Sequence, residues 1–342
     1  MSATTGGSHN PALSEEGMVA RFLRATEIDT RMLGMIGALL LIWAGFDLYG
    51  LFFKPGDGLL GGQFLTPRNL WTLLVQTSSI AVMATGMVLV IVMRQIDLSV
   101  GSMLTTIAVA VGALQVYHLA PAMGVGHPLI WIIAVAAGLV LGGLVGAFNG
   151  ALTAYAQIPS FIVTLGGLIA YRGIAFLLAS GVTIAPMDNT YVLIGGYGPA
   201  GSIGPTWSWV LALIACAGII LAILRGRQQR KRFRFPLRPV WAEVTLGVNG
   251  SGVVLGATAV VNAYPWAPKV IENYAKEHSL AIPPGIENRD GSAICMAGDK
   301  VVRCVEGLIF YNGYAIPVLI AIAVGLLMSF IAGRTRFGRY VY

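Results

Sequence analysis

Two opposite charges, Arg94 and Asp97, lie three residues apart in "VIVMRQIDLSVGSML", between two strongly apolar runs. Charges beside lipid are unfavourable, and a local pair of opposite sign lowers the free energy of placing either one there. Asp97 is also suited to cap the helix that follows, because its carboxylate accepts backbone N–H groups and favours the positive end of the helix dipole. The spacing therefore predicts a charged turn followed by a helix start.

Two interpretations of this turn compete. Ser99 and Ser102 add hydroxyls to the first turn of the following helix, and Gly101 allows close backbone packing. In the first interpretation, Asp97 caps a helix at an elbow between two membrane spans and does nothing else. In the second, the helix is discontinuous and its N-terminus faces a polar path through a helical bundle, as in many transporters. The residues alone leave both open.

The elements that position this turn are expected to be membrane-spanning helices. The chain has 342 residues, of which 56% are hydrophobic and 11% charged, and its mean hydropathy is +0.76. Soluble domains carry about 25% charged residues, so this chain has too few to cover a water-facing surface of its size. The predicted fold class is all-α: a polytopic transmembrane helical bundle. Its first apolar run is too long for the h-region of a signal peptide and is expected to remain as an anchor.

Eight apolar segments are predicted to span the membrane, after a cytoplasmic N-terminal segment of residues 1–31, and the membrane domain is 32–342. The predicted spans are Met32–Phe53, Leu70–Met93, Leu98–Leu119, Leu129–Gly150, Phe161–Ala179, Trp207–Leu224, Glu243–Ala263 and Ala315–Gly333. The seventh is the least apolar, with two Asn and four Gly inside it.

The distribution of Lys and Arg predicts the orientation of the spans. With the N-terminus in the cytoplasm, 14 of the 22 Lys and Arg residues lie inside, seven lie outside, and Arg172 lies within a span. Seven of the inner ones belong to the loop 225–239, which holds no acidic residue. Because spans flank this loop, the lipid bilayer with its anionic surface is its expected partner, and a nucleic acid is not.

The same topology places residues 264–312 outside, in a long loop that contains Cys295 and Cys304. In an oxidising periplasm these two cysteines are expected to form a disulfide, and two free thiols are the alternative. The third cysteine, Cys216, lies inside an apolar run and is expected to be a small core residue.

Glycines recur every four residues in the fourth span, at Gly138, Gly142, Gly146 and Gly150. Four residues are slightly more than one helical turn, so these glycines form one slowly drifting stripe that lets a neighbouring helix approach closely. The stripe is expected to serve helix packing. Lining a transport pathway is the alternative.

A second group of polar residues follows this span, in "FNGALTAYAQIPSFIVTLGGLIAYRG". Asn149 ends one span, Pro159 precedes a helix start, and Ser160 can satisfy free backbone N–H groups there. Arg172 lies deep in the fifth span, where an arginine either faces protein or water or extends toward the outer interface. Asp47, near the outer end of the first span, has the same two alternatives.

Five segments, in order along the chain, resemble motifs of the permease subunits of ribose, xylose and galactose-type ABC importers, most of all the xylose-type branch. They are "IDLSVGSM" (Ile96–Met103), "GAFNG" (Gly146–Gly150), "IPSFIVTLGG" (Ile158–Gly167), "AYRGI" (Ala170–Ile174) and "TRFGRYVY" (Thr335–Tyr342). Each motif alone is modest, but five in the same order are specific.

The resemblance implies the membrane subunit of an ATP-driven importer of a monosaccharide such as xylose, in a bacterial inner membrane. It implies three partners: a second copy of the permease, ATPase subunits on the cytoplasmic side, and a periplasmic sugar-binding protein. The chain departs from the family twice. The loop 264–312 is longer than the family pattern, and "RTRFGRYVY" ends the chain where the pattern continues into a cytoplasmic helix and further spans. The chain is therefore expected to be truncated at its C-terminus.

Catalytic, cofactor-binding and metal-binding residues are not expected. The chain has no Gly-x-x-x-x-Gly-Lys-[Ser/Thr] phosphate loop, its four histidines are scattered, and no nucleophile–base arrangement can be assigned. ATP hydrolysis is thus assigned to a partner subunit.

Two rival functions stay open at this point. One is a stand-alone secondary transporter or channel, which usually needs acidic residues deep in its spans. The other is an inactive fragment or a membrane anchor.

Overall fold

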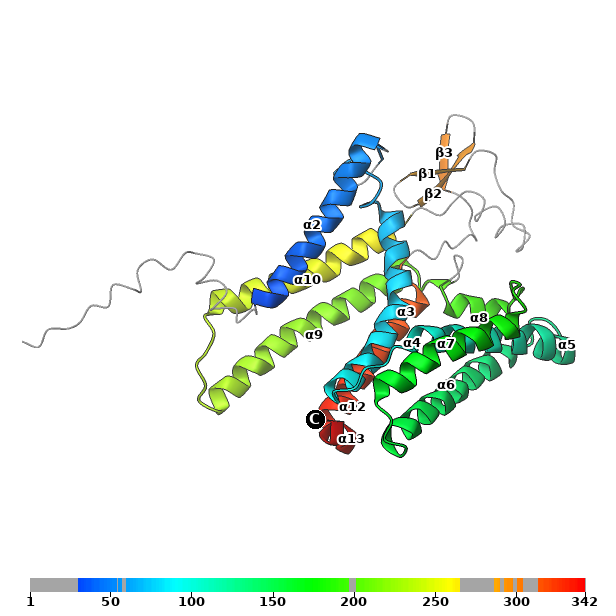
Figure 1. Cartoon of the computed structure of the whole chain (residues 1–342). Coiled ribbons are helices and arrows are strands. Elements are labelled where there is room, and N and C mark those ends of the chain that lie inside the picture. Colours follow the sequence, from blue (N-terminus) through cyan, green and yellow to red (C-terminus); the bar gives the residue numbers. More distant parts are fainter. Residues whose placement is uncertain are drawn as a thin grey trace, which may run out of the picture. The chain divides into compact units, whose positions relative to one another are not determined.

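The computed structural model describes residues 30–53, 55–56, 60–196, 201–264, 286–289, 292–297, 300–303 and 313–341 (Figure 1). The chain forms two compact units. The first combines residues 1–70 with 206–261, and the second combines residues 71–205 with 262–342. Each unit is described by itself.

All eight predicted spans are helices that are long and apolar enough to cross a membrane, which confirms the all-α, multi-span fold class. They are α2 (Thr30–Phe53), α3 (Pro67–Val92), α4 with its continuation η2 and α5 (Val100–Ala113, Leu114–Leu119, Ala120–Met123), α6 (Ile130–Ala154), α7 (Ser160–Ala179), α9 (Pro205–Arg232), α10 (Val240–Asn262) and α12 (Ile316–Arg334). Two short helices, α8 (Asn189–Ile194) and α13 (Arg336–Val341), follow α7 and α12.

A small β-sheet lies in the long connection between α10 and α12, where the sequence predicted only a loop. Strands β1 (Ile286–Arg289), β2 (Ser292–Ala297) and β3 (Lys300–Arg303) form an antiparallel meander. Cys295 belongs to β2 and pairs across the sheet with Ile286 and Val302. Cys304 lies outside the described residues, so the disulfide stays a prediction.

In the first unit, α9 and α10 form an antiparallel helical hairpin (Figure 1). Cys216 is buried, as predicted, and its thiol lies 3.9 Å from the carbonyl oxygen of Ser251. Gly247 and Gly250 of α10 face isoleucine side chains of α9, because a Cβ added at either glycine would lie 3.5 Å from an isoleucine methyl group. The isoleucine side chains of α9 therefore fill the space beside these two glycines of α10.

Asp47 faces protein, which settles the alternatives that the sequence left open. Its side chain is fully buried, and its two carboxylate oxygens accept the backbone N–H groups of Leu60 and Leu65, each at 2.9 Å. A Cβ added to Gly62 would overlap the carbonyl of Asp47. Asp47 therefore holds the connection that leads from α2 into α3.

In the second unit, α4 packs against α7 and α6, and the buried side chains between them include Val111, Ala134, Tyr171 and Ala175. Trp71 of α3 is also buried and donates its indole N–H to the carbonyl of Gly313, at 3.0 Å. This contact joins the start of α3 to the residues that lead into α12.

Half of the glycine stripe of α6 packs against a neighbouring helix. Added Cβ atoms at Gly138 and Gly142 would lie 3.5–3.6 Å from Val111 and Ile107 of α4, so these two glycines face that helix. Gly146 and Gly150 have no neighbour within 4 Å of an added Cβ. The predicted packing role thus applies to the first two glycines within this chain.

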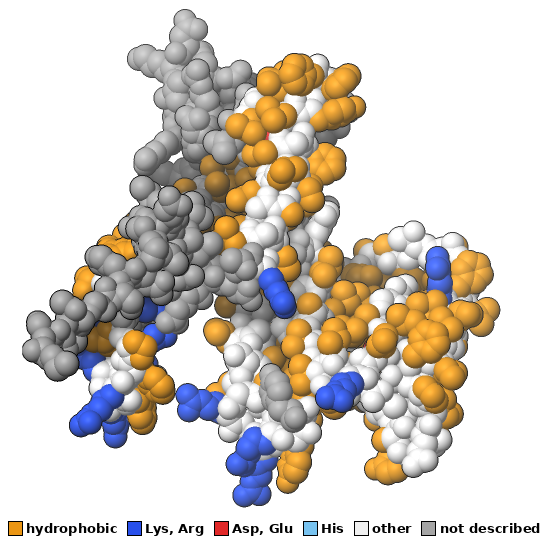
Figure 2. All heavy atoms as spheres, turned by 60° about the vertical axis from the view of Figure 1, so that its left-hand side comes forward, with side chains coloured by type: hydrophobic (Ala, Val, Ile, Leu, Met, Phe, Trp, Pro, Cys, Tyr) orange, Lys and Arg blue, Asp and Glu red, His pale blue; other side chains and the backbone are white. Residues whose placement is uncertain are grey.

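Apolar side chains remain exposed along the helices, as in a protein whose solvent is lipid. Figure 2 shows hydrophobic side chains over much of the described surface on the face that it displays, with Lys and Arg in small separate groups. The basic loop is shorter than predicted, because α9 continues through its first eight residues to Arg232.

Candidate functional site

The site is built around the short non-helical link between α3 and α4. Helix α3 ends in a Schellman-type turn: Arg94 adopts the left-handed conformation with φ 58°, and the N–H groups of Arg94 and Gln95 donate to the carbonyls of Ile91 and Val90. Arg94 is exposed, and in the described part of the chain it forms no ion pair with Asp97. The predicted charge pair is therefore wrong: Arg94 contributes a helix end.

Asp97 does not cap α4 directly. The N-cap residue of α4 is Ser99, and the Oδ1 atom of Asp97 accepts both the N–H of Ser99 at 2.8 Å and its Oγ–H at 2.7 Å. This is an Asx turn, in which the carboxylate orders the two residues before the helix. The Oγ of Ser102 donates to the carbonyl of Ser99. No atom of the described residues lies within 4 Å of a Cβ added at Gly101, so the expected close packing there is absent from this part of the chain.

The first turn of α7 holds this link on both sides. The N–H of Ile96 donates to Ser160 Oγ at 3.2 Å, and Thr164 Oγ1–H donates to the carbonyl of Ile96 at 3.3 Å. Pro159 lies directly before α7 and is its N-cap residue, the position at which the sequence predicted a cap from Ser160. Ser160, which was expected to satisfy N–H groups of its own helix, instead accepts one from a segment 64 residues earlier.

A chain of three side-chain hydrogen bonds runs from α7 through α6 to Asp97. Tyr171 Oη–H donates to Asn149 Oδ1 at 2.6 Å, Asn149 Nδ2–H donates to Ser99 Oγ at 3.3 Å, and Ser99 Oγ–H donates to Asp97 Oδ1. The three donors all point toward the carboxylate. Hydrogen bonds arranged in one direction polarise one another, so the chain strengthens the last bond to Asp97.

Burial separates the interior of this chain from its end. Ser99, Asn149 and Tyr171 are buried, with exposed fractions of 0%, 8% and 9%, whereas Asp97 is half-buried. Within the described residues, Asp97 Oδ2 accepts no hydrogen bond from the protein. The hydrogen bonds to Oδ1 hold the carboxylate of Asp97 in place, and Oδ2 remains available to a hydroxyl donor.

Helices α4 and α7 meet closely beside the chain of hydrogen bonds. A Cβ added to Gly167 would lie 2.9 Å from Tyr171 Cε2 and 3.3 Å from Ser99 Cβ. Thr106 Oγ1–H also donates to the carbonyl of Tyr171, at 2.6 Å. Only a residue without a side chain fits at position 167 while the buried serine and tyrosine keep their places.

Four residues of the site were not predicted from the sequence: Thr106, Thr164, Gly167 and Tyr171. A signal for three of them was present, because Ser160, Thr164, Gly167 and Tyr171 follow one another by four, three and four residues and so share one face of α7. Thr106 carried no comparable signal.

Arg172 lies outside this network. Its side chain is exposed on another face of α7, in line with the exposed apolar residues Ile169 and Phe176. The structure therefore does not bring Arg172 together with Asp97, Asn149 and Ser160.

The site offers hydrogen-bond donors and acceptors: one carboxylate, several hydroxyls and an amide. Among the residues that the structure describes, no group of three or more His, Cys, Asp and Glu is placed to hold a metal ion. This donor and acceptor set suits a neutral molecule with several hydroxyl groups.

The connection after α7 supplies one further polar contact. Asp188 caps α8 by accepting the N–H of Tyr191 at 3.1 Å, and burial raises the pKa of the Tyr191 phenol. The N–H of Asp188 donates to the buried Gln115 side chain in η2, a single π-helical segment. Such π-helical insertions occur often at functional sites.

Comparison with known protein families gives a match over most of the chain. The model for the permease component of branched-chain amino acid transport systems matches residues 69–342. This range contains the link between α3 and α4 and every residue of the hydrogen-bond chain.

Known relatives are sugar transport proteins. The chain is 28% identical over 281 residues to the xylose transport system permease protein XylH of Haemophilus influenzae, covering 82% of this chain and 59% of that protein. It is 35% identical over 208 residues to XylH of Escherichia coli, covering 60% and 49%. It is 33% identical over 163 residues to the ribose import permease protein RbsC of Escherichia coli, covering 46% and 47%. The chain thus spans about half the length of the curated relatives it matches. No solved structure matches it.

Proposed function

Since the chain belongs to the family of permease components of branched-chain amino acid transport systems, we propose that it is the membrane subunit of an ATP-driven importer whose cargo is a monosaccharide such as xylose. The relatives named for xylose and ribose transport support the choice of a sugar over an amino acid. A polyhydroxyl cargo also agrees with a site of hydroxyls, an amide and one carboxylate.

The observation that carries the proposal is the meeting of the sugar-permease motifs at one place. "IDLSVGSM", "GAFNG", "IPSFIVTLGG" and "AYRGI" are separate in sequence, yet Asp97, Asn149, Ser160 and Tyr171 from these four motifs lie in one hydrogen-bonded cluster. The cluster orders the link before α4 and leaves Asp97 Oδ2 at its accessible end. An accessible carboxylate oxygen at the end of a buried chain of hydrogen bonds supports a place beside the transport path.

The proposal includes an orientation and partners. The N-terminus lies in the cytoplasm of a bacterium, the chain crosses the inner membrane several times, and the loops 225–239 and 264–312 lie inside and outside. A second copy of the chain completes the path, ATPase subunits bind on the cytoplasmic side, and a periplasmic binding protein delivers the sugar. The excess of inner Lys and Arg supports the orientation, and family membership supports the ATPase and the binding protein.

Sugar uptake tests the proposal. The chain is produced, together with the ATPase and sugar-binding protein of a xylose importer, in a bacterial strain that cannot take up xylose. We expect radiolabelled xylose to accumulate, and excess unlabelled ribose or arabinose then ranks the sugars. The matched control carries a Lys substitution in the ATPase phosphate loop and is expected to abolish uptake.

Two outcomes contradict the proposal. Uptake that persists with the inactive ATPase would identify a secondary transporter or channel. Absence of uptake, together with failure of the chain to copurify with the ATPase, would identify a membrane segment that does not act in import.

A further inference from the structure

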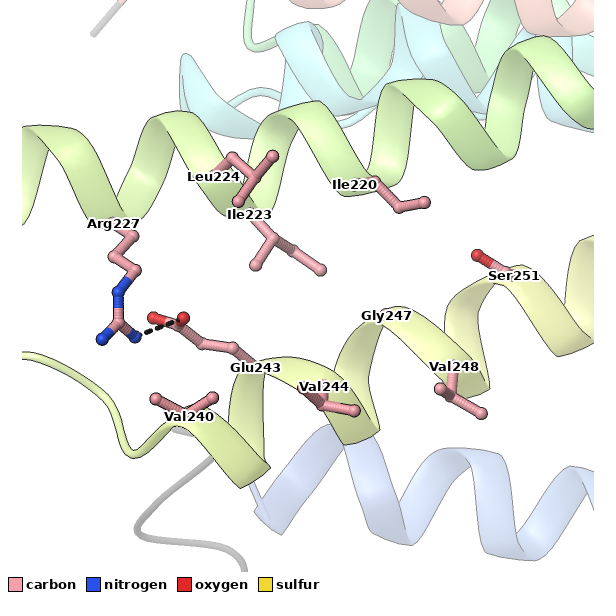
Figure 3. Close-up of a pocket in the computed structure, with 10 residues that line it drawn as sticks. All are labelled: Ile220, Ile223, Leu224, Arg227, Val240, Glu243, Val244, Gly247, Val248 and Ser251. Atoms are coloured by element: carbon pink, nitrogen blue, oxygen red, sulfur yellow. Dashed lines mark hydrogen bonds and ion pairs between the residues drawn. The ribbon is translucent and has the colours of Figure 1, made fainter.

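A groove of about 550 Å³ runs along the hairpin of α9 and α10 (Figure 3). The residues that line it belong to the first unit, whereas the cluster around Asp97 belongs to the second. Its walls are mostly apolar. Ile220 and Leu224 line it from α9, and Val240, Val244 and Val248 line it from α10. About half or more of each of these side chains is exposed, so the groove is open along its length. In a membrane, an open apolar groove of this kind lies against lipid.

One end of the groove is charged. Arg227 Nη1 donates to Glu243 Oε2 at 2.6 Å, and both residues line the groove (Figure 3). A guanidinium has five N–H donors, so this ion pair leaves most donors of Arg227 available. Lys231 lies one turn further along α9, because Ile220, Leu224, Arg227 and Lys231 follow at intervals of four, three and four residues. Lys231 is exposed and adds a net positive charge at this end.

The length of the groove matches one leaflet. Its α10 wall runs from Val240 to Ser251, and the eleven helical rises between these two residues, of 1.5 Å each, give about 16 Å. Half of a hydrocarbon core of about 30 Å is about 15 Å. The charged end coincides with the end of α9 that leads into the basic loop, where phospholipid headgroups lie. The groove, with its charged end at the headgroups, therefore spans about the depth of one leaflet.

We propose that this groove is a binding site for an anionic phospholipid, with one acyl chain between α9 and α10 and the phosphate on Arg227 and Lys231. Charge complementarity selects this occupant: the basic loop has seven Lys and Arg and no acidic residue, so the headgroup end favours a lipid of net negative charge over a zwitterionic one. The bound lipid stabilises the hairpin by filling the space that the splayed valine and isoleucine side chains leave.

Native mass spectrometry of the purified, delipidated chain tests this site without any transport assay, so its outcome is independent of the cargo and the ATPase. The chain is exposed to equal amounts of a phosphatidylglycerol and a phosphatidylethanolamine with identical acyl chains. We expect phosphatidylglycerol to be retained preferentially. Lys231→Gln is expected to lower its retention by about fivefold, since one Lys near an anionic membrane surface contributes about that factor, and Lys231→Arg is expected to restore it.

A second variant tests the acyl-chain part of the groove. Val244→Trp fills the groove and is expected to reduce lipid retention, whereas Leu221→Trp, on another exposed face of α9, is expected to leave it unchanged. Arg336→Gln, a basic residue beside a different span, is the matched control for charge. Equal retention of the two lipids, or wild-type retention by Lys231→Gln and Val244→Trp, would overturn the proposal. Loss of a dimer in Val244→Trp with no change in lipid retention would assign the groove to a second copy and would also overturn it.

Discussion

At the scale of single residues, Asp97 combines two roles that use different atoms. Its Oδ1 atom accepts the N–H and Oγ–H of Ser99 and so orders the start of α4, while Oδ2 makes no protein hydrogen bond within the described residues. The two interpretations of the sequence, a structural turn and a polar end of a helix beside a path, are therefore compatible. A substitution that separates the two roles must keep Oδ1 as an acceptor and remove the charge.

Asp97→Asn is such a substitution, because the amide oxygen still accepts both hydrogen bonds from Ser99. We expect the variant to reach the membrane in normal amounts and to lose xylose uptake by about tenfold or more, since hydrogen bonds to charged groups contribute about 1.5–3 kcal/mol. Uptake is measured at equal membrane abundance. Arg94→Gln is the control: it removes the neighbouring charge, which forms no ion pair with Asp97, and should keep near-normal uptake. Wild-type uptake by Asp97→Asn would reduce the motif to a structural turn.

At the scale of elements, the contact between α4 and α7 decides the geometry of the site. Gly167 brings the two helices together beside Ser99 and Tyr171, and its neighbour Gly166 has nothing within 4 Å of an added Cβ. The two adjacent glycines of α7 therefore form a natural pair, one at a helix contact and one at an open surface.

Gly167→Leu is expected to lower stability by about 1–3 kcal/mol, because overpacking at a close helix contact displaces side chains and backbone. Gly166→Leu is the matched variant and is expected to be neutral or slightly stabilising, since leucine favours a helix more than glycine does. Thermal unfolding of both purified variants in the same detergent compares them. A Gly167→Leu protein as stable as Gly166→Leu would show that α4 and α7 are further apart than described here.

The sequence predicted the spans well because each is an apolar segment long enough to cross a bilayer, and this property is local. The ends were less certain. Arg, Gln and Lys are good helix formers, so α9 continues to Arg232 through residues that were expected to form a loop. The π-helical segment and the three-stranded sheet carried no signal that was recognised.

The site was predicted in pieces. Asp97, Asn149 and Ser160 were each singled out, but their meeting depends on helix packing across 50 or more residues, which one sequence does not reveal. The predicted Arg94–Asp97 ion pair was wrong because each of the two residues takes part in a local turn instead. Arg94 closes α3 in a left-handed turn, and the two donors of Ser99 occupy the Asp97 oxygen that faces the chain.

At the scale of the whole molecule, successive spans are expected to cross the membrane in alternating directions. Contacts between connections that such a topology places on the same side of the membrane support this expectation. The link between α3 and α4 meets the start of α7, and residues 202–203 pair with residues 314–315 before α12. Each pair is separated by an even number of spans. These contacts support alternation and do not by themselves identify the cytoplasmic side.

Cysteine labelling tests the side directly. In a background without Cys295 and Cys304, Gln229→Cys in the basic segment is expected to react with a membrane-impermeant thiol reagent only when the cytoplasmic face is opened. Val125→Cys, at a position 88% exposed between α5 and α6, is expected to react from outside in intact cells. The buried Cys216 serves as the unreactive internal control. The reverse pattern would invert the topology and the roles assigned to both long loops.

The attachment of Ile96 to α7 also constrains how this protein moves. Both backbone groups of Ile96 are held by the first turn of α7, and Thr106 adds a third hydrogen bond from α4 to that helix. Sliding α7 past α4 would break all three together, so the two helices are expected to move as a rigid body. A hinge that changes access to the path must then lie outside this body. The nearest backbone segment outside the rigid body of α4 and α7 is the turn at Arg94. The motion that opens and closes the path is therefore expected to rotate α3 about that turn.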